Sequence, residues 1–281
     1  MTSGTRTERL LERLCHRSFL RMWAHRSPYR LQRDKRSAAQ GKELCDVLVI
    51  FEDDVFLFSD KEIEWKDHPK NGVAWSRWHD RAIAASAKQL AGAERWLRAH
   101  PERVFADKEC TVPLPVALPS MNAARFHRIA VAHGSADACR RHFVGGSGSL
   151  MLDTLVGADL PFTVGREGRR DAFVHVFDEA TLMLILTNLD TLPEFRDYIV
   201  SKERLLLEGT EIMATGEEDL LAIYLKSEDP KKPNKHGFGD TDGFDVLVVR
   251  GVAISDGACV ALCDGWQAVT GCFPFPFPRW A

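Results

Sequence analysis

Four side chains that could take part in catalysis or metal binding lie at the ends of two neighbouring apolar runs. Asp46 opens the first run, and Ser59, Asp60 and Lys61 close the second. An aspartate on one strand, with an acidic residue and a lysine on the next, can hold a Mg²⁺ ion that polarises a phosphate and lowers the pKa of a bound water. The lysine then stabilises the attacking hydroxide and the developing charge. An ordinary ion pair at a strand end uses the same residue types, so both interpretations stay open.

The two apolar runs predict a β-hairpin. Residues 45–51 and 55–58 are β-branched or aromatic, and the acidic stretch 52–54 separates them. Both strands are apolar on both faces, which is typical of strands covered on each side. We therefore expect the hairpin inside the fold, with its turn centred on residues 53 and 54.

That turn sets the cross-strand neighbours. It places Asp46 directly opposite Lys61, and directly opposed residues point to the same face of a sheet. Side chains alternate along a strand, so Ser59 is expected on the face of Asp46 and Lys61, and Asp60 on the other face. The prediction is an acid–base pair at one end of a buried hairpin.

Other segments supply the elements that position the hairpin. Apolar residues at helical spacing predict helices, and short β-branched or aromatic runs predict strands. The expected helices are 6–24, 76–100, 179–187 and 193–207, and the further strands are 126–132, 172–177 and 244–249. The fold class is α/β, with a mixed central sheet flanked by helices over residues 1–208. Residues 209–281 are expected to form a helical or irregular C-terminal extension, since the proline-rich stretch 273–278 cannot join a central sheet.

Composition narrows the class of protein. The 281 residues are 45% hydrophobic, enough to bury a core without disulfides or metal. A net charge of −3 excludes a globally basic protein, although a local groove can still be positive. Seven cysteines without a CxxC pair are typical of free thiols in a reducing cytosol. With no signal-peptide core and no apolar run of about 18 residues, we expect a cytoplasmic protein that does not cross a membrane.

The string DVLVIFEDDVFLFSDK, from Asp46 to Lys61, resembles the nuclease-related domain family, a branch of the PD-(D/E)xK nuclease superfamily. That family reads Asp, an apolar strand, a short turn, a second apolar strand and Glu-x-Lys, and the Asp-to-Lys spacing matches without a gap. The order of a helix before the hairpin, a helix carrying Gln89 after it, and a strand at 126–132 also agrees. The resemblance covers residues 6–135, or in its wider form residues up to about 208.

The resemblance implies a restriction-endonuclease-like core and a Mg²⁺- or Mn²⁺-dependent nuclease that cleaves DNA or RNA phosphodiesters. In that function Asp46 is a metal ligand and Lys61 orients the water or the phosphate. Gln89 is a candidate because the corresponding helix of the family often bears a glutamine near the site.

One residue departs from the family pattern. Ser59 occupies the position of the glutamate in Glu-x-Lys, and a neutral hydroxyl is a poor ligand for a hard divalent cation. Three explanations stay open. In the first, the second carboxylate has moved to Asp60 through a bulge, or to Glu43, Glu62 or Glu64. In the second, the site uses Asp46 with a glutamate of the first helix, Glu8 or Glu12, and in the third, catalysis is lost and the domain only binds.

These alternatives define the candidate site. The catalytic candidates are Asp46, Lys61, Asp60, Ser59, Glu12 and Gln89, and the candidate metal ligands among them are Asp46, Asp60 and Glu12. The alternative function is a catalytically inactive nuclease-fold module that binds nucleic acid or protein. Nucleic acid is the expected partner, with a protein partner or a second copy of the chain as further candidates.

Two other groups have a functional and a structural interpretation. The helix at 75–100 carries Arg77, His79, Arg81, Lys88, Arg95 and Arg98, which could contact phosphates or form a solvated face with i,i+4 pairs. Trp65, Trp75 and Trp78 could stack on bases, although aromatic residues more often anchor a core.

Overall fold

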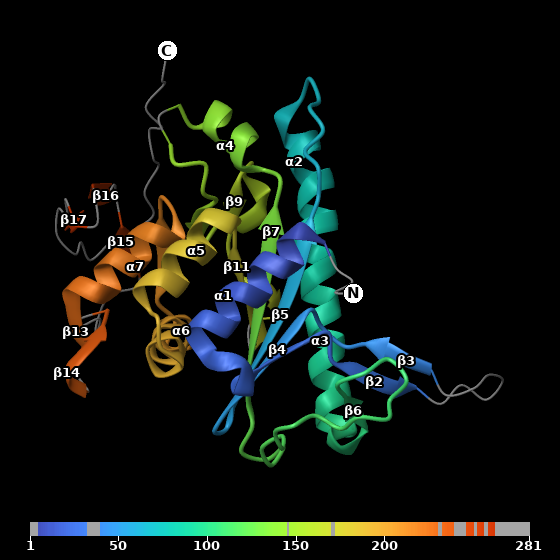
Figure 1. The fold of residues 1–281 in the computed structure, drawn as a ribbon. Coiled ribbons are helices and arrows are strands. Elements are labelled where there is room, and N and C mark those ends of the chain that lie inside the picture. Colours follow the sequence, from blue (N-terminus) through green and yellow to red (C-terminus); the bar gives the residue numbers. More distant parts are fainter. Residues whose placement is uncertain are drawn as a thin grey trace.

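The structure is a computed structural model that describes residues 5–32, 40–144, 146–169, 172–229, 232–238, 246–249, 252–255 and 258–261. It is an α/β protein in which a mixed sheet packs between helices (Figure 1), as the sequence predicts. No helix in these ranges is long and apolar enough to cross a membrane.

The central sheet contains six of the described strands, in the order β1-β4-β5-β7-β11-β10. Their bounds are β1 Ala24–Arg26, β4 Val47–Phe51, β5 Asp54–Glu62, β7 Arg125–His133, β11 Ala172–Phe177 and β10 Glu167–Arg169. The strands β1, β4 and β5 are antiparallel, whereas β5, β7 and β11 are parallel. The carboxyl ends of the three parallel strands therefore share one edge of the sheet.

The hairpin β4–β5 forms as predicted, but its register differs. Phe51 pairs with Asp54, so the turn consists of Glu52 and Asp53, and Glu52 has a positive φ of 53°. The last ladder pair is Val47 with Phe58. The predicted register was two residues off, because apolar strands of period two accept either alignment and a local turn geometry decides between them.

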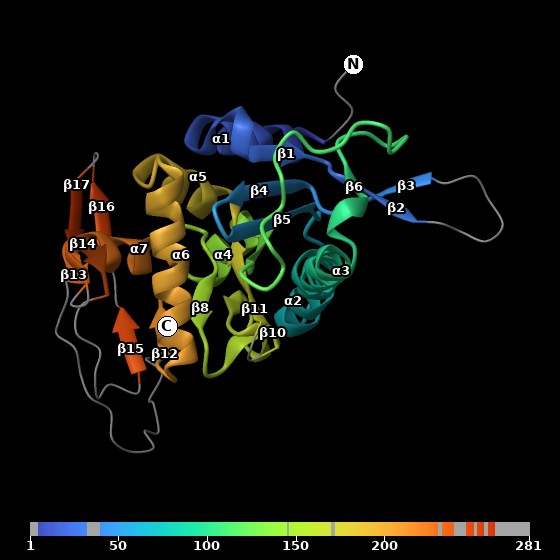
Figure 2. The same cartoon turned by 90° about the horizontal axis from the view of Figure 1, so that it is seen from below.

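Helices cover both faces of the sheet (Figure 2). One long helix runs without a break through α2 (Asn71–His79), the π-helical turn η1 (Asp80–Ala84) and α3 (Ala85–Ala99). It begins five residues before the predicted start at 76 and packs on β5 and β7. The helices α1 (Arg6–Trp23), α5 (Glu179–Asn188) and α6 (Leu192–Leu207) lie on the opposite side.

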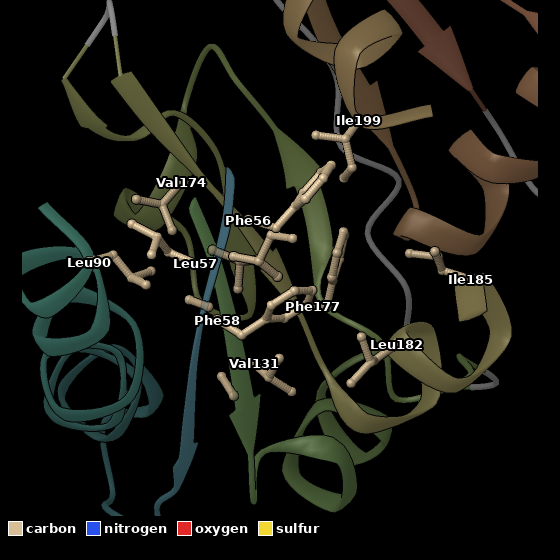
Figure 3. Close-up of a cluster of buried hydrophobic side chains, with 14 of the residues drawn as sticks. Phe56, Leu57, Phe58, Leu90, Val131, Val174, Phe177, Leu182, Ile185 and Ile199 are labelled. Carbon is tan, nitrogen blue, oxygen red and sulfur yellow. The ribbon is translucent and has the colours of Figure 1, made fainter. Parts of the chain in front are cut away.

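The core is apolar on both sides of β5 (Figure 3). Phe56 and Phe58 point toward α6, where both rings contact Phe195, whereas Leu57 points toward Leu90 of α3. Each of these side chains is fully buried or nearly so. Burying an aromatic or aliphatic side chain of this size contributes about 1.5–3 kcal/mol, so the hairpin is a main source of stability, as expected from its two apolar faces.

The C-terminal part is less helical than predicted. Within the described residues after 208 there are one helix, α7 (Glu217–Lys226), and six short strands: β12 Glu211–Ala214, β13 Ser227–Asp229, β14 Lys232–Gly237, β15 Val246–Val249, β16 Val252–Ser255 and β17 Ala258–Ala261. The strand β12 pairs with β8 (Met151–Asp153) in a second sheet of order β15-β12-β8-β9. Its hydrogen bonds cross the predicted boundary at residue 208. The proline-rich stretch 273–278 lies outside the described residues.

Shorter elements complete the chain. They are β2 Tyr29–Gln32, β3 Gln40–Glu43 and β6 Val104–Phe105 in a third sheet, β9 Thr163–Val164, α4 Ala136–His142, and the 3₁₀ turns Pro101–Arg103 and Gly157–Asp159.

Candidate functional site

Asp46 lies directly before β4 and is 6% exposed. Its backbone N–H donates to the carbonyl of Phe58, and its Oδ2 accepts the backbone N–H of Asp60 at 2.6 Å. The carboxylate thus bonds to β5 beyond the first ladder pair of β4. Burial raises the pKa of Asp46 to about 6, although the bond from Asp60 and the charge of Lys61 act in the opposite direction.

Ser59 and Gln89 meet on the α3 side of β5. The Ser59 side chain is completely buried, and its Oγ lies 3.2 Å from the Oγ of Ser86 and at a long 3.5 Å from Oε1 of Gln89. The structure therefore brings Ser59 together with Gln89, the predicted glutamine of the helix. Lys61, two residues along the same strand, is partly exposed and forms no ion pair with another described residue. Its charge acts on Asp46 through space rather than through a direct ion pair.

Asp60 lies on the opposite face of β5, as strand alternation predicts. Its Oδ1 is 2.9 Å from Nε2 of His133, whose Nδ1 is 3.5 Å from Glu179. Burial alone would lower the pKa of His133, but these two carboxylates outweigh burial and raise it. The strand β5 pairs without a register shift with β4 and with β7, so no bulge turns Asp60 toward Ser59.

Glu12 lies on α1, where it contacts Arg26. Its Oε2 accepts a hydrogen bond from Nη1 of Arg26 at 3.0 Å, and Glu8 lies 3.7 Å from the same guanidinium. The predicted helix carboxylate is thus committed to an ion pair with β1.

The donor set does not fit the divalent cation that the family resemblance implies. Asp46 contributes one carboxylate with one oxygen already bonded, Ser59 contributes a neutral hydroxyl, and Asp60 faces the other side of the sheet. A hard cation such as Mg²⁺ prefers several oxygen ligands with carboxylates among them. Across the described ranges, no three His, Cys, Asp or Glu side chains are arranged to hold a metal ion.

A buried charge network that the sequence did not predict lies at the other end of β5. Nε2 of His127 is 2.9 Å from Oδ1 of Asp54, and its Nδ1 is 2.9 Å from Oε1 of Glu203. The same Glu203 oxygen lies 3.1 Å from Nε2 of His175, and the exposed Arg125 donates twice to Asp54, at 2.7 and 2.8 Å. His127 has a partner at each ring nitrogen, whereas His175 has one at Nε2 and its buried Nδ1 has none among the described residues. These partners come from distant segments that no local pattern identifies.

The side chains of Trp65, Trp75 and Trp78 pack against other parts of the protein. Trp75 and Trp78 are buried, and their indole N–H groups donate to the carbonyls of Ala158 and Ile63. Trp65 stacks on Phe162 with ring centres 4.9 Å apart. Their rings are therefore occupied by protein contacts rather than presented to bases.

No family model, no curated protein and no solved structure matches this chain.

Asp46→Asn is expected to stabilise the protein at alkaline pH. A carboxyl group whose pKa is raised by folding costs nothing while protonated, below about pH 4, and destabilises the fold as pH rises through 6. A rise from 3.8 to about 6 corresponds to about 3 kcal/mol. The asparagine oxygen can still accept the N–H of Asp60, so the variant should unfold in more urea than the wild type at pH 8 and equally at pH 4. Asp53→Asn in the exposed turn is the control, and a variant less stable than wild type at pH 8 would contradict the prediction.

Proposed function

We propose that this chain is a nuclease-like module of the PD-(D/E)xK type that binds nucleic acid without cleaving it. The observation that carries the proposal is that Asp46, Ser59, Lys61 and Gln89 lie at one end of the hairpin with a hydroxyl in place of the second carboxylate. The order of the surrounding elements supports it: a helix, the hairpin, the helix carrying Gln89 and the parallel strand β7 follow one another as the resemblance implies.

Lys61 is the group in this set that suits a phosphate. Its ammonium is partly exposed and has no ionic partner within the described part of the chain. An ammonium on a flexible stem binds a phosphate oxygen as a point charge. The nearby Asp46 carboxylate is buried, and its bond to the Asp60 N–H holds it in place.

A metal-dependent phosphodiesterase is the second candidate. It is favoured by Asp46 and Lys61, which keep the family's spacing and share a face of the hairpin. The second carboxylate that this chemistry needs is the feature that the site lacks.

A binding and cleavage assay separates the two candidates. Purified protein is incubated with plasmid, single-stranded DNA and RNA, with and without Mn²⁺, and binding is measured in parallel. We expect binding without cleavage, and a roughly fivefold weaker affinity for Lys61→Ala at 0.15 M salt, the loss of one phosphate contact. Lys226→Ala removes an exposed lysine at the end of α7 and should change nothing.

Cleavage that needs Mn²⁺ and disappears in Asp46→Asn would overturn the binding-only proposal and establish the phosphodiesterase. Unchanged affinity of Lys61→Ala would remove Lys61 from the binding site.

A further inference from the structure

The long helix from Asn71 to Ala99 carries an unusual set of cations on the side away from the sheet. Arg77, Arg81, Lys88 and Arg95 are all exposed. None of the four has a carboxylate partner among the described residues, which sets them apart from the ordinary solvated face with i,i+4 pairs. We call these four side chains the cationic helix face.

The remaining charges of the helix do not compensate this face. Glu94 accepts hydrogen bonds from Arg98 at 2.8 Å and from Arg128 of β7 at 2.8 Å, so its negative charge is paired with these two arginines rather than with the cationic helix face. His79 lies 3.2 Å from Glu167 on the sheet side. Asp80 is the one further acid on the helix, and the face keeps an excess of positive charge.

The spaces between the cations are filled by small residues. Ala84 and Ala85 are exposed between Arg81 and Lys88, and a Cβ added at Gly92 would meet no atom within 4 Å. A glycine in a helix interior costs about 0.5–1 kcal/mol relative to alanine, so Gly92 weakens the helix while leaving its surface open to a closely approaching partner.

The dimensions suit a nucleic acid backbone. Arg77 and Arg95 are 18 residues apart, which at 1.5 Å per residue is about 27 Å along the helix. Duplex DNA rises about 3.4 Å per base pair, so this length covers about eight base pairs.

We propose that the cationic helix face binds the phosphate backbone of duplex DNA. The inference rests on the proposed function, which supplies nucleic acid as the partner, and it adds a second surface and a strand preference. A single strand is disfavoured because its binding relies on aromatic stacking, and the tryptophans of this helix are occupied. Trp75 and Trp78 are buried, and the guanidinium groups of Arg30 and Arg103 both lie over the Trp96 ring.

Gly92→Glu tests the face without removing any packing. Position 92 is four residues from Lys88 and three from Arg95, so a glutamate there can pair with both. Four phosphate contacts give a slope of log affinity against log salt near −3.6, and a roughly 150-fold loss between 50 and 200 mM salt. A glutamate carries one charge and neutralises one of these two cations, so we expect Gly92→Glu to bring the slope to about −2.7, and the matched neutral variant Gly92→Gln to leave it unchanged.

Equal slopes for the two variants would overturn the proposal. Equal affinity for a duplex, for a single strand of the same sequence and for poly-glutamate would also overturn it, since the last two lack the backbone of a duplex. The Lys61→Ala variant distinguishes the two proposals. If Lys61→Ala binds nucleic acid like wild type while Gly92→Glu does not, binding at Lys61 is refuted and binding at the cationic helix face is supported. If Lys61→Ala binds more weakly while Gly92→Glu binds like wild type, binding at the helix face is refuted and binding at Lys61 is supported.

Discussion

Replacement of His127 by glutamine is expected to cost about 3 kcal/mol of folding stability at neutral pH. The imidazolium lies between Asp54 and Glu203, both within 2.9 Å, and its own side chain is 2% exposed. Removing one partner of a buried ion pair is strongly destabilising because it leaves a buried charge uncompensated. Asp54 keeps Arg125 and Glu203 keeps His175, which places the loss at the lower end of the usual range of about 3–5 kcal/mol.

The loss should depend on pH in a defined direction. Burial opposes the charge on His127, but the two carboxylates outweigh it and raise its pKa from 6.5 to about 9. A group whose pKa is raised by folding contributes stability that is complete below its unfolded pKa and disappears as pH rises through its folded pKa. The gap between wild type and His127→Gln should therefore be largest at or below pH 6.5 and should narrow above pH 9.

Urea titrations at pH 6.5, 8 and 10 measure this gap. His142→Gln is the matched control, because His142 is exposed at the end of α4 and makes no ion pair with a described residue. A gap that stays constant from pH 6.5 to pH 10 would show that His127 acts through packing on Phe56, 4.6 Å away between ring centres, rather than through its charge.

Lys202→Met is expected to destabilise the protein by about 3–5 kcal/mol. Lys202 is 3% exposed, and its Nζ donates to both carboxylate oxygens of Glu217, at 2.8 and 2.6 Å. Tyr198 donates a third hydrogen bond to the same carboxylate at 2.6 Å. The variant would leave Glu217 charged and buried at the contact between α6 and α7, with the tyrosine as its remaining partner.

The double variant Lys202→Met/Glu217→Gln should recover most of that loss. A buried ion pair can often be replaced by neutral groups at little cost, whereas half of a pair cannot. Thermal unfolding of both single variants and the double variant gives the coupling energy, and Lys226→Met, at an exposed lysine, should be neutral. A double variant as unstable as the sum of its singles would mean that the two charges do not interact.

The sequence predicted the elements better than their partners. Strand β11 was expected at 172–177 and has those bounds, and α6 begins at Leu192 with Pro193 in its first turn, as expected of a helix near 193. Such elements follow from local patterns of apolar residues. The start of the long helix was missed because residues 71–75 contain a glycine and follow a proline, and both usually mark a linker.

The neighbours of the candidate residues could be predicted only in part. Alternation along a strand correctly separated Asp60 from Ser59, and Gln89 lies 3.5 Å from Ser59, whereas the role predicted for these residues stays a prediction. The partner of Asp60 is His133, 73 residues later, and the partner of His127 is Glu203, 76 residues later. Contacts between residues so far apart in the sequence depend on which strands become neighbours in the sheet. No local sequence pattern carries that information.

The two aspartate–histidine contacts have a consequence for how the sheet assembles. Phe56 pairs with His127 and Glu62 with His133, so both histidines reach the aspartate two residues earlier on β5. A slide of β5 against β7 by two residues, in the direction that sets His127 opposite Phe58, would keep apolar side chains in the core, yet it would separate both acids from their imidazoles at once. Chains mispaired in that direction are thereby penalised during folding, where hydrophobicity alone would accept the alignment.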